Sequence, residues 1–85
     1  MTQRSYSELG KRFDELARSR GVRGPTAIAN HVREKTGKGP GRSAWGRILY
    51  GDITPSKDTV RLFAEAFELN AQQATSLAVL YVFGK

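Results

Sequence analysis

Cysteine is absent from this sequence, and histidine and tryptophan each occur once. Without cysteine the chain has neither a disulfide framework nor a thiolate metal site, which fits a reducing compartment. No apolar run approaches the roughly 18 residues that a membrane-spanning helix needs. Residues 1–5 open a polar segment that lacks the apolar core of a signal peptide. We therefore expect a soluble, cytoplasmic protein.

Combinations of catalytic residues are also missing. His31 has no second histidine, cysteine or carboxylate cluster near it in the sequence, so an exposed helical position is expected rather than a metal ligand. Asp14 and Glu15 are adjacent, so on a helix they point about 100° apart and cannot share a site. We predict that the protein is not an enzyme and uses no cofactor.

Positive charge is plentiful, and it is concentrated in one half of the chain. The 85 residues carry a net charge of +6. Residues 1–47 hold most of the Lys and Arg, whereas acidic and basic residues nearly balance in residues 48–85. A basic half joined to a neutral half suggests one charged face directed at a polyanion. No segment combines a strong apolar face with a Lys- and Arg-lined polar face, so nucleic acid is a better partner than a membrane surface.

Five segments of the chain have helical periodicity or helix-favouring composition, and short connections join them. Serine, asparagine and proline mark the expected helix starts, and glycine marks several of the ends. Together the segments predict an all-α fold, a five-helix bundle around one core. They are residues 5–20, with Ser5 as N-cap, Glu8 completing a capping box and Gly21 at the end; 24–36, opened by Pro25 and closed by Gly37; 41–50, closed by Gly51; 57–69, with Ser56 as N-cap; and 71–83, with Asn70 as N-cap.

The apolar stripes of these segments predict the core. The fourth segment has a regular i, i+3, i+4, i+7 stripe, which is typical of a core helix and not of a cofactor site. The expected core residues are Leu9, Phe13, Leu16 and Ala17; Ile28, Ala29 and Val32; Trp45, Ile48 and Leu49; and Val60, Phe63, Ala64 and Phe67.

The last segment is apolar without interruption over residues 77–83. A strand there stays open, because short apolar runs are ambiguous. We favour a helix that has more apolar residues than one core-facing side needs. The surplus is buried in a homodimer, or else the natural chain continues further. Ala74, Leu77, Ala78 and Tyr81 could face the core, which leaves Val79, Val82 and Phe83 over.

The third segment, residues 41–50, carries two stripes at the same helical spacing. One is apolar and predicts a seam on the core, and the other is small, cationic and hydrogen-bonding. A helix anchored in this way can enter a DNA major groove, where the fork of Arg matches guanine edges. An ordinary surface helix with a solvated Arg-rich face is the alternative. The polar stripe is Arg42, Ser43, Gly46, Arg47 and Tyr50.

Gly46 stands in the middle of this segment, where glycine costs about 1 kcal/mol relative to alanine. A side chain there would collide with DNA, or another protein segment packs over the same spot, or glycine is simply tolerated. The loop before the segment, residues 37–41, is rich in glycine, but its spacing does not match a nucleotide-binding loop. We expect it instead to let Lys38 and the helix N-terminus meet a DNA phosphate.

Several motifs follow one another along the chain: Leu9-Gly10…Phe13…Leu16, Ile28-Ala29, Ile48-Leu49-Tyr50-Gly51, Pro55-Ser56 and Leu62-Phe63-Ala64-Glu65-Ala66-Phe67-Glu68-Leu69. In this order they resemble the helix-turn-helix domain of the lambda-repressor-like (XRE) family of bacterial and phage transcription regulators. The resemblance covers about residues 6–70. The turn before the third segment is longer than usual and Pro25-Thr26 stands at the start of the second, so the chain is similar to an actinobacterial or phage branch with an extended turn.

The resemblance implies a DNA-binding transcriptional regulator that reads the major groove with residues 41–50. The family positions that reach base edges fall on Arg42, Ser43 and Arg47, and the buried position falls on Trp45. Charge and the resemblance together give the expected phosphate contacts, which are Arg20, Arg23, Thr26, Lys35, Lys38, Tyr50, Gly51, Thr54 and Lys57.

The chain then divides into a helix-turn-helix DNA-binding domain, residues 1–70, and an apolar C-terminal helix, residues 71–85. We expect a homodimer through residues 71–83 that binds double-stranded DNA in the nucleoid. Two other functions stay open. One is a nucleoid-associated architectural protein that binds DNA mainly by charge, and the other is a helix-turn-helix adaptor that contacts proteins.

Overall fold

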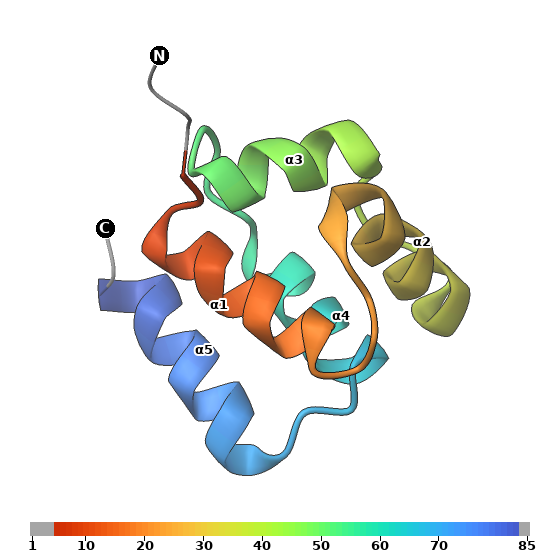
Figure 1. Ribbon diagram of the computed structural model, residues 1–85. Coiled ribbons are helices and arrows are strands. Elements are labelled where there is room, and N and C mark those ends of the chain that lie inside the picture. The colour runs from red at the N-terminus through yellow and green to blue at the C-terminus, as the bar shows by residue number, and fades with distance from the viewer. Residues whose placement is uncertain (1–4, 84–85) are drawn as a thin grey trace.

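The computed structural model describes residues 5–83, and over these residues the chain forms five α-helices and no strand (Figure 1). The predicted all-α class is therefore confirmed, and residues 77–83 are helical. Residues 1–4 and 84–85, which the predicted division into residues 1–70 and 71–85 includes, lie outside the described residues. No helix in the described range is long and apolar enough to cross a membrane. The helices are α1 (Glu8–Arg18), α2 (Gly24–Thr36), α3 (Arg42–Tyr50), α4 (Lys57–Ala66) and α5 (Ala71–Phe83).

One hydrophobic core is shared by all five helices. At its centre the Phe13 ring meets Trp45 and Phe63 edge-on, with ring centroids 5.3 and 4.7 Å apart. Such edge-to-face pairs add roughly 0.5–1.5 kcal/mol each beyond the area that they bury. Leu77 of α5 is fully buried in the same cluster. All the core residues predicted for the first three segments are buried.

The start of α1 differs from the prediction. Ser7, not Ser5, is the N-cap, and its Oγ accepts a hydrogen bond from the Gly10 N–H at 3.0 Å. The Ser7 N–H also donates to the Leu49 carbonyl of α3 at 2.9 Å. This tertiary contact fixes which serine caps the helix. The expected capping box with Glu8 is therefore wrong, and α1 ends at Arg18.

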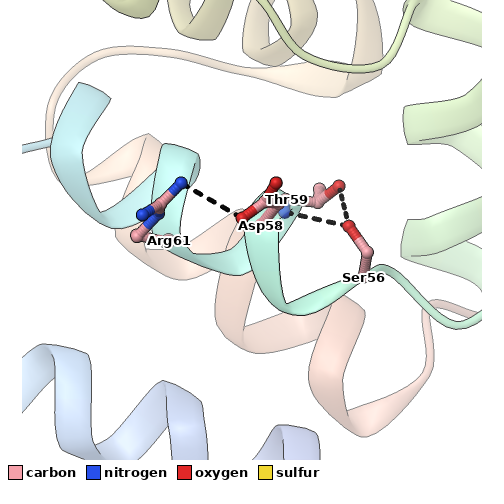
Figure 2. A network of polar contacts seen from close by, with 4 residues as sticks. All are labelled: Ser56, Asp58, Thr59 and Arg61. Atoms are coloured by element: carbon pink, nitrogen blue, oxygen red, sulfur yellow. Dashed lines mark hydrogen bonds and ion pairs between the residues drawn. The ribbon is translucent and has the colours of Figure 1, made fainter.

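Polar contacts at the start of α4 confirm the predicted N-cap (Figure 2). Ser56 Oγ accepts a hydrogen bond from the Thr59 N–H at 3.1 Å and lies 3.0 Å from Thr59 Oγ1. Asp58, in the first turn, pairs with Arg61 at 3.1 Å on the exposed side. The side chain of Ser56 thus satisfies one of the backbone donors that the first turn leaves unpaired.

The buried face of α4 is rotated from the predicted one. Val60 and Ala64 are only half-buried, because the face toward the core is centred on Leu62 and Phe63. The helix also ends at Ala66, earlier than expected. Glu68 then takes a left-handed φ of 49°, which prevents the helix from continuing. The buried residues of the segment are Thr59, Leu62, Phe63, Ala66 and Phe67.

Helix α5 begins with a reciprocal cap, as predicted from Asn70. Asn70 Oδ1 accepts a hydrogen bond from the Gln73 N–H at 2.8 Å, and Gln73 Oε1 accepts one from the Asn70 N–H at 3.2 Å. Leu77 enters the core and Ala74 and Tyr81 are half-buried, but Ala78 is exposed and Leu80 is half-buried in its place. The predicted surplus is found, since Val79, Val82 and Phe83 are 50, 60 and 79% exposed.

His31 is not the exposed residue that the sequence predicts. Its Nε2 donates to the Ala66 carbonyl oxygen at 3.0 Å, and its ring lies over Phe67 with centroids 4.4 Å apart. The half-buried imidazole therefore ties the middle of α2 to the end of α4. This contact depends on the fold and has no local signature in the sequence.

Candidate nucleic-acid interface

Helix α3 lies along one edge of the molecule, packed against α1 and α2 (Figure 1). Gly51 ends it in a left-handed conformation (φ 84°), and the Asp52 N–H closes the last turn on the Arg47 carbonyl at 2.8 Å. The Leu49 carbonyl accepts from the Ser7 N–H. These contacts satisfy the last carbonyls of α3 and fix the position of its C-terminal end.

The two predicted stripes of α3 are found on different sides of the helix. Trp45, Ile48 and Leu49 are buried in the core. The side chains predicted to reach base edges are all exposed, namely Arg42, Ser43 and Arg47. Helix α5 does not cover them, because α1 lies between α3 and α5 (Figure 1). The packing of α3 thus leaves a cationic, hydrogen-bonding surface accessible to a partner.

The predicted phosphate contacts fall into groups around this helix. Arg23 is the N-cap of α2, and Thr26 lies in the first turn of the same helix. Both are exposed on an element that packs directly against α3. Lys35 and Lys38 are exposed before α3, at the end of α2 and in the following loop. The predicted phosphate contacts that follow α3 are also exposed, namely Gly51, Thr54 and Lys57.

Arg20 is engaged elsewhere. Its guanidinium donates to Gln73 Oε1 at 3.2 Å, to the Glu68 carbonyl at 3.3 Å and to Ser19 Oγ at 2.9 Å. These bonds join the end of α1 to the connection between α4 and α5. Its expected contact with phosphate stays a prediction, and we leave Arg20 out of the candidate interface because its donors already serve the protein.

Tyr50, at the far end of the polar stripe, is supported by a residue that sequence reasoning missed. The Tyr6 ring meets it edge-on at 4.9 Å. Burial, with smaller effects of the Asp14 carboxylate and of Tyr50, raises the pKa of Tyr6 above its ordinary value. Tyr6 precedes α1 and reaches α3 only through the fold, so no pattern along the chain could have paired the two rings.

Arg33 is a second contributor that the sequence did not single out. Its Nε donates to the Gly39 carbonyl at 3.4 Å, across the loop that leads from α2 into α3. At the end of α2, Thr36 Oγ1 donates to the Lys38 carbonyl of this loop at 2.9 Å. The loop that carries Lys38 is therefore held against the end of α2 by side-chain contacts, although it contains glycine at three positions.

Groups suited to other chemistry are scarce in the described range. Residues 5–83 contain no group of three or more His, Cys, Asp or Glu side chains that could hold a metal ion. An open hollow of about 340 Å³ lies between the start of α1, residues 51–55 and Tyr81. Its lining is largely apolar and includes one carboxylate, that of Glu8. The hollow offers no arrangement of groups for acid–base catalysis.

Comparison of the chain with protein-family models, curated proteins and solved structures found no match. The lambda-repressor-like assignment therefore stays a prediction from the order of motifs.

Proposed function

We propose that this protein is a DNA-binding transcriptional regulator that inserts α3 into the major groove. One observation carries the proposal. Helix α3 buries its apolar stripe completely, while Arg42, Ser43 and Arg47 stand exposed on the remaining surface. A helix held in this way has the dimensions of the major groove, which is about 12 Å wide in B-form DNA.

The side chains divide into two roles. Arg42, Ser43 and Arg47 read base edges, and a bidentate Arg–guanine pair is worth about 1–3 kcal/mol of discrimination. Lys38 before α3 and Lys57 after it neutralise phosphates, as do Arg23 and other exposed groups near the helix. Phosphate contacts give affinity without sequence information, and they make binding weaken as salt rises.

Selection of bound duplexes from a random pool at two salt concentrations tests the proposal. We expect an enriched motif, which then serves as the specific site for variants. Arg47→Ala should lose the preference for this site over random duplex. Lys38→Ala should weaken binding to both duplexes about equally, because it removes only a phosphate contact.

Arg12→Ala is the matched control, because it removes the same charge from a surface that α1 shares with Gln72 and Gln73 of α5. It should change binding to either duplex little. Equal losses on specific and random duplex for Arg47→Ala would contradict the base-reading role of this residue.

The uneven charge favours one alternative, an architectural protein that binds DNA mainly by charge. A flat selection profile with a steep dependence on salt would identify it. The exposed apolar end of α5 favours a second alternative, an adaptor that contacts proteins. Absence of duplex binding at low salt would support the adaptor and refute the proposal.

We further propose that two copies associate through α5. Helix α5 carries no charged residue along Ala71–Phe83, and its exposed side includes Val79, Val82 and Phe83. Two chains of net charge +6 repel one another, so an uncharged apolar surface is the favourable place for them to meet.

Sedimentation equilibrium over a range of concentrations tests this contact. Val82→Lys should shift the population to monomer, because a charge in an apolar interface lacks a partner. Glu65→Gln raises the net charge by the same amount on α4 and should leave the association unchanged. A wild-type protein that stays monomeric at the highest concentration contradicts the dimer.

A further inference from the structure

Two glycines lie within the helices of the described residues, beyond the first helical position, and the fold explains only one of them. Gly10 of α1 lies against the backbone of Leu49, and a Cβ added there would collide with the Leu49 carbonyl. Apart from its chain neighbours and the nearby backbone of α3 itself, a Cβ added at Gly46 would meet no atom within 4 Å. The φ of Gly46 is not positive, so an L residue can adopt its backbone conformation. Packing by another segment of residues 5–83 therefore does not account for Gly46.

The surroundings of Gly46 make it a low point on the exposed face of α3. Arg42 stands one helical turn before it and Tyr50 one turn after it, on the same row of the helix surface. Ser43 and Arg47 border it on the neighbouring row. The long side chains thus surround a position at which the helix backbone itself is the surface. A partner that enters between them can come as close to the α3 axis as a helix permits.

We propose that Gly46 is the point of closest approach between α3 and the floor of the DNA major groove, and that it sets how deeply the helix inserts. This inference rests on the proposed function. A helix that lay across the phosphates would gain nothing from the missing side chain at position 46. The guanidinium groups of Arg42 and Arg47 extend much further from the helix than a Cβ at that position would, so they would reach the phosphates in either case. Base reading is more demanding, because a bidentate contact requires both ends of the guanidinium at hydrogen-bond distance from one base. A side chain at position 46 would hold the helix away from the bases and break that geometry.

The test uses Gly46→Ala and Gly46→Leu, because both residues are much better helix formers than glycine. The melting temperature of Gly46→Ala should rise by about 4–8 °C, the shift expected when glycine is replaced inside an exposed helix of a domain this small. Its affinity for the selected site should fall by about 10- to 100-fold, as expected when an extra methyl is forced into a close-packed contact. Gly46→Leu should lose more. Binding to random duplex should change little in either variant.

Ser76→Ala is the matched control, since it also favours helix but lies on the side of α5 that faces Arg12 and Leu16 of α1. It should leave binding to the selected site unchanged. A Gly46→Ala protein that binds this site as tightly as the wild type overturns the inference and leaves the proposed function standing. Equal losses on selected and random duplex also overturn it, because they indicate a general weakening. If the wild type binds no duplex at low salt, the proposed function itself fails.

Discussion

Gly10→Ala tests the contact that fixes α3 on the rest of the protein. The added Cβ would fall on the Leu49 carbonyl oxygen, and it would lie 2.7 and 2.8 Å from the carbonyl carbon and Cα of the same residue. These are backbone atoms of α3, which cannot rotate away as the end of a flexible side chain can. Helices α1 and α3 must therefore move apart.

The expected loss of free energy of unfolding is the balance of one stabilising and two destabilising effects. Alanine favours the helical state by about 1 kcal/mol over glycine. Forcing extra volume into a close-packed contact costs about 1–3 kcal/mol. Separation of the helices also weakens the bond from the Ser7 N–H to the Leu49 carbonyl, now 2.9 Å long, and such a bond contributes about 0.5–1.5 kcal/mol. The net destabilisation should be about 0.5–3.5 kcal/mol.

Urea unfolding measures this loss, with the buried indole of Trp45 as a fluorescent reporter and circular dichroism as a second probe. In a domain of this size each kcal/mol lowers the melting temperature by about 4–8 °C. Gly46→Ala is the control, because the same chemical change at an open position should stabilise the fold. If Gly10→Ala unfolds at the same urea concentration as the wild type, or at a higher one, the close approach of α1 and α3 is refuted.

Two further predictions concern a helix cap and a titrating phenol. Ser56→Ala should destabilise the protein by about 1 kcal/mol, because the Thr59 N–H loses its acceptor. Arg61→Ala breaks only an exposed ion pair and should change the free energy of unfolding by less than about 0.5 kcal/mol; equal urea midpoints for the two variants would contradict this ranking. Burial, helped by the Asp14 carboxylate, raises the pKa of Tyr6 above 10.0, so the stability from its neutral phenol is complete below that pH and is lost as pH rises through the raised pKa. Tyr6→Phe should therefore lose less stability than the wild type between pH 9 and 11, and equal losses would show that Tyr6 has no part in the alkaline decline.

Much of the fold could be predicted because its determinants are local. The apolar stripes of α1, α2 and α3 follow directly from helical spacing, and all their predicted residues are buried. Ser56 and Asn70 cap their helices through bonds that span three residues. Gly37 and Gly51 take the left-handed conformation at the ends of α2 and α3. Each of these features depends on residues within about one turn of one another.

The wrong predictions concern features that depend on residues far apart in the sequence. Two serines precede α1, and the bond between Ser7 and Leu49, 42 residues away, selects the one that caps the helix. His31 is half-buried because α4 ends beside it. The face of α4 is centred on Leu62 because α2 and α5 both pack against that helix, which its own periodicity does not reveal. Contacts between distant segments decided each case.

For the candidate interface, too, the local features could be predicted and the contacts between distant segments could not. Spacing alone separated the polar stripe of α3 from its core stripe, because both lie on one short helix. The cations outside α3 were harder to rank. Arg20 and Arg23 are three residues apart and look equivalent in the sequence, yet Arg20 donates to the α4–α5 connection while Arg23 begins α2 beside α3. Charge along the chain predicts that a basic surface exists, but the fold decides which cations belong to it.

The position of α1 makes the two proposed surfaces compatible in one small domain. Since α1 lies between α3 and α5, a second copy that docks on α5 approaches from the side away from the proposed DNA-reading helix (Figure 1). The contact would join the uncharged helices of two chains that each carry +6. Their cationic surfaces would then remain apart and accessible, and a duplex that bound both would offset their mutual repulsion. With basic residues on α5 instead, association would bring like charges together and compete with DNA for the same surface.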